Sequence, residues 1–166
     1  MADTTKGASD DERLLYAARS DDEDLLLEIF EKGNFNINHQ DGQGNTALHY
    51  AASKGSTEVL EHILSHEDCD VDPVNYILKQ TPLHLAVQLE DPELRQYVVE
   101  SLLDAGADMS IKDKTGSTAL DYVAEADTEI LKSFRRAQAV KAVSQDDLAS
   151  DGDEDSEDSG DGSDED

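Results

Sequence analysis

The sequence predicts an all-α protein: a solenoid of about four helix-turn-helix units joined by hairpin-like loops, followed by a disordered acidic tail. Three observations predict this fold. A short pattern with a threonine, a leucine and a pair of small residues recurs at a spacing of about 35 residues. A second stretch of helical character follows each copy. After Leu148 the chain contains no further large apolar residue, so its end cannot build a core.

The repeat is defined by three copies of the pattern and a degenerate fourth. Thr46–Ala52 reads TALHYAA, Thr81–Val87 reads TPLHLAV and Thr118–Ala124 reads TALDYVA, with 35 and 37 residues between successive threonines. The degenerate copy, Glu12–Ala18, reads ERLLYAA and lies 34 residues upstream of the first. Second helices are expected over residues 24–32, 57–66, 93–105 and 128–142.

Residues typical of helix starts and helix ends support the same division of the chain into helical units. Threonine hydroxyls at the head of each copy can accept a backbone N–H and cap the first helix. Pro82 fits the first helical position, where its missing N–H costs nothing. Gly33 and Gly106 supply the left-handed conformation that ends a helix. Because each unit exposes an apolar face that only a neighbour can cover, the units must stack.

The two end units differ from the inner ones. Ser9 and Glu12 have the spacing of a capping box, where later units have threonine. In the last unit Arg135 and Arg136 occupy positions that are apolar in earlier second helices, as a terminal cap requires. We therefore divide the chain into a flexible N-terminus (1–9), a repeat domain (10–143) and a disordered acidic tail (144–166).

These residues resemble the ankyrin repeat, whose signature is Thr-Pro-Leu-His followed by a pair of small residues. Residues 81–84 match the whole tetrapeptide, and Leu102–Asp108 resembles the helix end and turn of the family. The resemblance implies a non-enzymatic, cofactor-free module that binds another protein. It also implies that His49 and His84 are structural and bond the threonine and nearby backbone.

The resemblance further implies a concave groove with variable contact positions. On the hairpins these are Gln43, Asn45, Ile77, Leu78, Gln80, Lys114, Thr115 and Ser117. At the ends of the first helices they are Arg19, Ser20, Ser53, Lys54, Gln88, Leu89 and Glu125. Three of them, Ile77, Leu78 and Leu89, are apolar where solvated residues are expected. Either they are hot spots for a partner, or the long 69–80 loop folds over them as a local core.

Charge narrows the class of partner. The chain has 40 acidic residues against 13 basic ones, a net charge of −27 and a pI near 4.1, which argues against nucleic acid and anionic membranes as partners. No apolar run approaches the ~20 residues of a spanning helix. The first residues lack the apolar core of a secretion signal, and the single Cys69 cannot form an internal disulfide. We expect a protein of the cytoplasm and nucleus.

The sequence contains little evidence for a catalytic site or a metal site. His62, His66 and Cys69 have spacings that could suit zinc, but no paired-cysteine motif accompanies them, and histidine also complements a helix end. Residues 151–155 suggest a calcium loop superficially, yet Ser156 and Gly162 stand where that loop needs glycine and glutamate. Nucleophile elbows and phosphate-binding glycine loops are lacking. We expect no enzyme, no metal and no cofactor.

The tail has two interpretations. Residues 145–166 contain 12 acids and no base. They either solvate the protein or steer a basic client toward the groove, an attraction that weakens with salt. Ser144, Ser150 and Ser163 each precede an aspartate by three residues, a pattern of acidophilic kinases. Phosphorylation of one such site adds ~1.5–2 negative charges.

A small ankyrin domain with an acidic tail resembles, in its architecture, the dedicated ribosomal-protein chaperones of fungi. That resemblance implies a basic client, such as a ribosomal protein or a histone, shielded by a protein that is monomeric apart from its partner. The alternative is a regulatory ankyrin adaptor or scaffold. Such a protein binds a signalling, proteolytic or transcription-factor partner through the groove alone.

Overall fold

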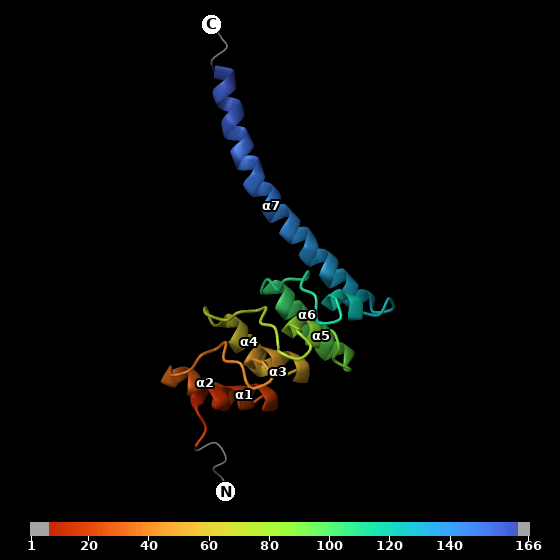
Figure 1. The fold of residues 1–166 in the computed structure, drawn as a ribbon. Helices are drawn as coiled ribbons and strands as arrows, with labels where there is room; N and C mark the ends of the chain where they lie inside the picture. The colour runs from red at the N-terminus through yellow and green to blue at the C-terminus, as the bar shows by residue number, and fades with distance from the viewer. Residues whose placement is uncertain (1–6, 163–166) are drawn as a thin grey trace.

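Four helix pairs stacked in one direction build the molecule (Figure 1). The computed structural model describes the backbone of residues 7–162 and the side chains of residues 7–146. Its elements are α1 (Asp10–Ser20), α2 (Glu23–Lys32), α3 (Ala47–Lys54), α4 (Thr57–Ser65), α5 (Pro82–Ala86), α6 (Pro92–Asp104), the 3-10 helix η1 (Ala119–Tyr122) and α7 (Thr128–Gly162). Residues 7–162 contain no β-strand. The predicted all-α stack of four units is confirmed, and the first helix of the last unit is reduced to a single 3-10 turn.

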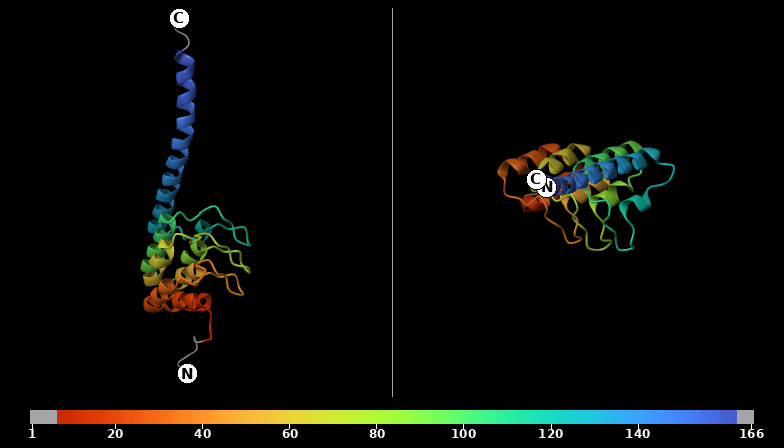
Figure 2. Two further views of the ribbon diagram at one scale, coloured as in Figure 1. Left: turned by 90° about the vertical axis from the view of Figure 1, so that its left-hand side faces the viewer. Right: turned by 90° about the horizontal axis from the view of Figure 1, so that it is seen from above.

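The helices form two rows. The inner row consists of α1, α3, α5 and η1, each in contact with the next. The outer row consists of α2, α4, α6 and the start of α7, which also contact one another in order. Three loops between successive units project from the stack as hairpins (Figure 2). This arrangement offers partners an outer face of helices and a second surface formed by the hairpins and the ends of the inner helices.

The predicted capping residues act as expected at three of the four inner helices. Ser9 and Glu12 form the capping box of α1, and the hydroxyls of Thr46 and Thr81 accept N–H groups at the starts of α3 and α5. Thr118 differs, because its N–H and hydroxyl donate to the Asp121 carboxylate at 2.8 and 3.1 Å. The aspartate that replaces histidine in the last unit therefore still bonds the threonine.

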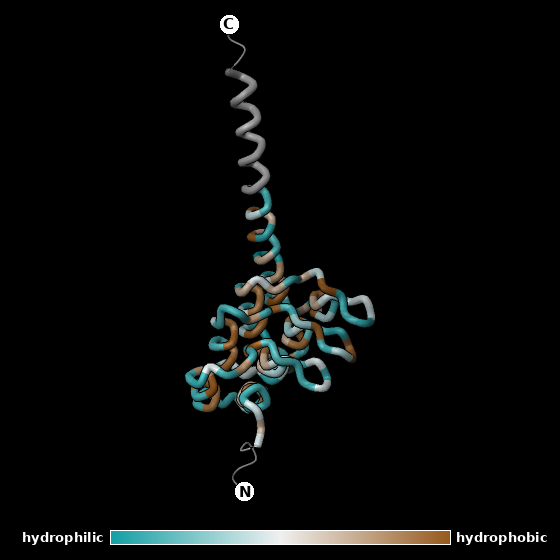
Figure 3. The backbone as a smooth tube through the Cα atoms, turned by 60° about the vertical axis from the view of Figure 1, so that its left-hand side comes forward, coloured by the Kyte–Doolittle hydropathy of each residue, from teal (hydrophilic) through white to brown (hydrophobic). Residues whose placement is uncertain are grey.

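Small apolar residues bring the two rows together. The alanine pairs of the first two units, residues 17–18 and 51–52, are fully buried, as is Ala86 of the third. Leu14, Leu48 and Leu83 occupy one equivalent position in three inner helices, and all three are buried. Figure 3 shows that hydrophobic residues concentrate in the stacked helices, whereas the hairpins are mostly hydrophilic. The core is thus continuous along the stack.

Helix α7 begins in the stack and continues beyond it (Figure 1). Ile130 and Phe134 are buried in the core, while Arg135 and Arg136 are exposed, as predicted for a terminal cap. The helix extends to Gly162, and the predicted disorder of residues 144–166 concerns this extension and stays a prediction. Residues 1–6 and 163–166 lie outside the described residues.

Gly44 lies in the first hairpin and packs against Tyr76 of the second, so a substitution there tests how tightly the two hairpins pack. Its φ is +83°, and an added Cβ would lie 2.6 Å from Cδ1 of the Tyr76 ring. A Gly44→Ala substitution is expected to lower the free energy of unfolding by about 1–2 kcal/mol from backbone strain, with the clash adding to that loss. Gly42→Ala is the matched control, since a Cβ there meets no atom within 4 Å. Urea denaturation measures both, and equal stability of the two variants would contradict the packing.

Candidate functional site

Three hairpins, which we call the hairpin row, are bonded side by side at one edge of the stack. They comprise residues 41–45, 75–80 and 113–117. The backbone N–H of Tyr76 donates to the carbonyl of Gln43 at 2.9 Å, and that of Lys114 donates to the carbonyl of Leu78 at 2.8 Å. Predicted contact residues from three different repeats therefore become neighbours in one surface.

Two aspartates anchor the hairpin row to the inner helices. The hydroxyl of Tyr50 donates to Asp41, and that of Tyr122 donates to Asp113. Asp113 also accepts a hydrogen bond from Nε2 of Gln80 at 3.0 Å. These hydrogen bonds hold the pKa of Asp113 well below its usual range, and the bond from Gln80 has the largest effect. These anchors were not predicted, although an aspartate nine residues before a tyrosine in two repeats was a signal for them.

The predicted structural role of the two tetrapeptide histidines is confirmed. Nδ1 of His49 accepts the backbone N–H of Thr46 at 3.0 Å, while Nε2 donates to the carbonyl of Gln80 at 2.9 Å. His84 makes the same pair of bonds, to Thr81 at 3.2 Å and Ser117 at 3.0 Å. Burial lowers the pKa of His49. Each histidine thus ties the cap of its own helix to the next hairpin.

The structure leaves most predicted contact residues accessible. Those exposed are Arg19, Ser20, Gln43, Lys54, Ile77, Leu78, Gln88, Lys114, Thr115 and Glu125, and those half-buried are Asn45, Ser53, Leu89 and Ser117. The assignment of Gln80 is wrong, because its side chain is directed inward to Asp113 and the residue is only 5% exposed. Leu89 packs partly against the core rather than standing free in a groove.

The tip of the middle hairpin is an exposed apolar surface. Tyr76, Ile77 and Leu78 are 51%, 61% and 49% exposed. The alternative in which the 69–80 loop folds over Ile77 and Leu78 as a local core is therefore wrong. Lys79 completes the turn with a left-handed φ of 58°, and the Tyr76 ring lies against Gly44. Hydrogen bonds within the hairpin row fix the backbone of this tip, so its side chains project toward a partner from an ordered position.

The outer helices are rich in acids, whereas bases without an ion pair lie mostly elsewhere. The outer helices α2, α4 and α6 carry nine acidic residues, and their two bases, Lys32 and Arg95, are both in ion pairs. Bases without an ion pair within 4 Å, among residues with described side chains, gather at inner-helix ends and hairpins: Arg19, Lys54, Lys79, Lys112 and Lys114, with Arg135 on α7 as the exception. The outer face is therefore acidic, whereas the hairpin row and its surroundings carry free positive charge.

A hollow of about 460 Å³ lies in the acidic outer face, between α2, α4 and α6. Glu23, Glu58, Glu61 and Glu93 line it together with Leu94 and Tyr97. Glu61 accepts hydrogen bonds from the hydroxyls of Tyr97 and Ser101, both at 2.9 Å, and the first of these bonds raises the pKa of Tyr97. Three successive repeats supply these carboxylates, so the spacing within any one repeat could not predict the hollow.

The three residues considered for zinc do not converge. Nε2 of His62 lies 2.7 Å from Oε1 of Glu23, whereas the ring of His66 packs edge-on against Phe30 and Phe35. Cys69 is half-buried, and burial raises the pKa of its thiol to about 11. Across the described residues, no three His, Cys, Asp or Glu side chains are grouped so that they could hold a metal ion. The calcium-like residues 151–155 lie outside the described side chains.

The described part of the chain contains no helix that is both long and apolar enough to cross a membrane.

Comparison with known proteins agrees with the geometry. Residues 14–113 match the family described as Ankyrin repeats, in three copies. An ankyrin repeat-containing protein of Saccharomyces cerevisiae is 37% identical over 130 residues, which cover 72% of each chain. Diacylglycerol kinase zeta of Rattus norvegicus is 31% identical over 82% of this chain, and Protein phosphatase 1 regulatory subunit 12A of Mus musculus is 32% identical over 76%. This chain spans only 14% and 12% of those two larger proteins.

Proposed function

The chain belongs to the ankyrin-repeat family, whose stacks are protein-binding modules, and we propose that it is a non-enzymatic chaperone or escort that shields a basic client. A ribosomal protein or a histone has the required chemistry. In this proposal the protein works in the cytoplasm and nucleus, is monomeric apart from its partner, and binds neither nucleic acid nor membranes.

The observation that carries the proposal is the distribution of acidic residues over two surfaces that can act on one client. One is the outer face of α2, α4 and α6. The other is the segment after Gln145, whose 12 acids lie beyond the part of α7 that packs in the stack. Carboxylates on a tether raise the rate at which a basic protein arrives, and a hollowed acidic face can then hold it.

The hollow between the outer helices suits a lysine or arginine side chain. Its carboxylates offer ion pairs, while Leu94 and Tyr97 offer apolar and aromatic surface for the stem and the cation. Client binding was expected in the groove, yet the groove side carries most of the bases that have no ion pair. The charges therefore favour the outer face as the docking surface for a basic client.

Removal of residues 146–166 is expected to weaken client capture at least tenfold at low salt and by less than about threefold at 0.5 M salt. The reason is that the Debye length falls from ~10 Å at 0.1 M to ~3 Å at 1 M, so a tethered polyanion loses its reach. Baits of the full chain and of residues 1–145 are compared by affinity capture and mass spectrometry. The shorter bait keeps the buried part of α7, since Ile130 and Phe134 precede the cut.

The same capture separates the outer face from the groove. Glu58→Lys with Glu93→Lys reverses two exposed charges of the hollow, and Glu90→Lys with Glu125→Lys makes the same charge change away from the outer row. A basic client lost with the first pair and kept with the second supports the proposal. Equal losses would mean that net charge alone holds the client, which contradicts a defined site.

The alternative, a regulatory adaptor or scaffold, rests on the exposed hairpin tip. Ile77→Glu with Leu78→Glu removes that apolar surface without touching the core. A neutral or acidic signalling, proteolytic or transcription-factor partner, held equally by both baits and lost with this pair, would establish the adaptor. It would also contradict the chaperone.

Phosphorylation at Ser144, Ser150 or Ser163 belongs to the same proposal, because added negative charge strengthens a polyanion. Ser144 is exposed on α7, where its hydroxyl donates to the Val140 carbonyl at 3.2 Å. The side chains of Ser150 and Ser163 lie outside the described residues.

A further inference from the structure

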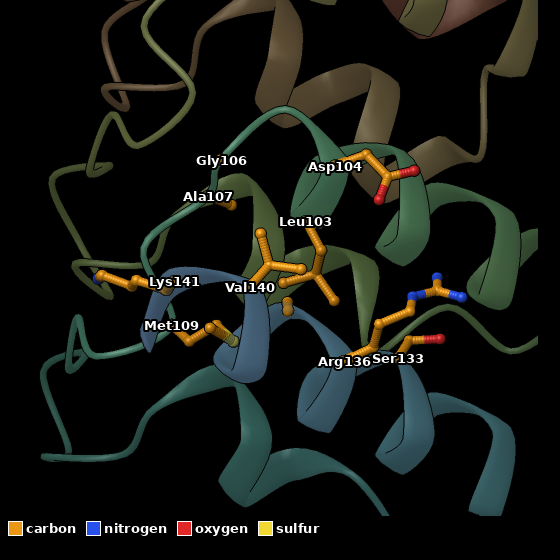
Figure 4. Close-up of a pocket in the computed structure, with 10 residues that line it drawn as sticks. Leu103, Asp104, Gly106, Ala107, Met109, Ser133, Arg136, Val140 and Lys141 are labelled. Carbon is orange, nitrogen blue, oxygen red and sulfur yellow. The ribbon is translucent and has the colours of Figure 1, made fainter. Parts of the chain in front are cut away.

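An apolar slot opens at the C-terminal end of the stack, between α7 and the end of α6 with the loop that follows it (Figure 4). Its volume is about 380 Å³, and Leu103, Met109 and Val140 form much of its lining. Here α7 continues beyond the stack, so the side of α7 that faces α6 is only partly covered. Val140 and Val143 are accordingly 63% and 61% exposed. The slot is large enough to accept an apolar side chain from outside.

Two bases line this slot in a strongly acidic protein. Residues 130–145, which we call the basic segment, contain four exposed bases and no acid, while the whole chain has a net charge of −27. Two of these bases, Arg136 and Lys141, lie at opposite ends of the slot (Figure 4). Asp104 is the one acid that lines it. The basic segment is therefore an island of charge opposite to that of the rest of the chain.

The two bases at the slot are weakly engaged within the chain. Arg136 lies 3.9 Å from Glu100 and Lys141 lies 4.0 Å from Asp108, whereas Arg13 contacts Asp10 at 2.9 Å. The side chains of Arg136 and Lys141 are both more than half exposed. Long, exposed pairs of this kind contribute little stability, so both cations are free to pair with an incoming carboxylate.

We propose that this slot docks an acidic segment of a partner protein that carries a large apolar side chain. The apolar side chain enters between Leu103, Met109 and Val140, and flanking carboxylates pair with Arg136 and Lys141. Charge complementarity selects this occupant, since a basic segment would meet two cations at the ends of the slot. The surface is thus distinct from the acidic outer face and takes a partner of the opposite charge.

The geometry argues against the chain's own acidic tail as the occupant. The last large apolar residue, Leu148, is eight positions beyond Val140 on the same continuous helix. At 1.5 Å per residue its backbone lies about 12 Å further along the helix axis, beyond the slot. The 12 acids that follow the basic segment should instead compete with an acidic partner through their long-range field, without entering the slot. Removing them is expected to strengthen binding at the slot.

The test measures fluorescence anisotropy of a synthetic 16-residue helical peptide with leucines on one face and glutamates elsewhere. Arg136→Glu with Lys141→Glu in the full chain is expected to weaken binding at least tenfold. Lys132→Glu with Arg135→Glu is the matched control, because it makes the same charge change on the same helix outside the slot. The control pair is expected to weaken binding less than threefold. Val140→Asp, at an exposed position, should weaken it at least fivefold without a change in melting temperature.

Two further peptides and one vesicle complete the experiment. Replacement of the peptide's leucines by serine, or of its glutamates by lysine, is expected to abolish binding. Equal weakening by both charge-reversal pairs, or stronger binding of the lysine peptide, would overturn the proposal. Binding to phosphatidylserine-containing vesicles without binding to the peptide would overturn it in favour of a membrane.

The outcome separates this site from the proposed client-binding function. Loss of residues 146–166 should strengthen peptide binding several-fold, whereas it should weaken capture of a basic client. If client capture does not depend on the tail but the peptide still binds at the slot, the proposed chaperone function fails and the slot stands. If the tail deletion weakens peptide binding as well, the proposed competition between tail and partner is wrong.

Discussion

Replacement of Leu60 by alanine is expected to lower the free energy of unfolding by about 3 kcal/mol. Leu60 is fully buried in α4, and this helix contacts both its inner partner α3 and the next outer helix α6. Truncation of such a leucine removes its apolar contacts and leaves a cavity, at a cost of about 2–5 kcal/mol. For a domain of this size the melting temperature should fall by about 10 °C. Urea and thermal denaturation measure both quantities.

Leu27→Ala is the matched control for that change. Leu27 lies on α2 in the same outer row but is 40% exposed, so its truncation creates no closed cavity and should cost less than about 1 kcal/mol. A similar loss from both variants would contradict the position of Leu60 at the centre of the stack. A loss confined to part of the transition would mean that the stack unfolds in segments, which nearest-neighbour repeat arrays can do.

The parts of the fold that depend on local chemistry could be predicted from the sequence. Thr46 and Thr81 accept an N–H three residues on, so the cap is encoded within four residues. Gly33 ends α2 with φ of 69° for a similarly local reason. The stacking of the units could also be predicted, because the paired alanines and equivalent leucines leave each unit with an uncovered apolar face.

Contacts between repeats could not be predicted in the same way. Gln80 has the position of an exposed hairpin residue, yet Asp113 lies opposite it one repeat later and draws its side chain inward. Leu89 follows a helix of only five residues, and the turn after α5 places it against the core. In both cases the contact that determines the burial of the side chain comes from another part of the chain. The pattern of a single repeat cannot predict such a contact.

The acidic outer face could not be predicted from the sequence either, because acids and bases are interspersed along the repeats. Only the two rows of helices collect acids on the outer face and unpaired bases near the hairpins. In the two proposals, a basic client and an acidic partner segment bind different surfaces of one small stack. The acidic tail is expected to favour the first and disfavour the second, so its removal tests both.

Replacement of His49 by alanine is expected to cost about 3 kcal/mol of unfolding free energy. The change empties the space of a fully buried imidazole and leaves the buried N–H of Thr46 without a partner, while the Gln80 carbonyl keeps only the hydrogen bond from the N–H of Asn75. An unsatisfied buried group costs about 1–3 kcal/mol. His62→Ala is the control, since His62 is half exposed and contacts Glu23 across the surface, and its loss should cost less than about 1 kcal/mol. Equal losses would contradict the role of His49 as a link between repeats.

The stabilising effect of His49 should depend on pH in a direction fixed by its environment. Burial lowers the pKa of His49 in the folded protein, whereas the unfolded chain titrates near pH ~6.5. Below that pH the unfolded state binds a proton that the folded state does not, so the contribution is complete above it and declines as pH falls. The difference in unfolding free energy between the parent protein and His49→Ala should therefore shrink between pH 7.5 and pH 5. Because both proteins carry the same 40 carboxylates, their titration largely cancels in that difference. A difference that stays constant over this range would mean that the imidazole is not held neutral between Thr46 and Gln80.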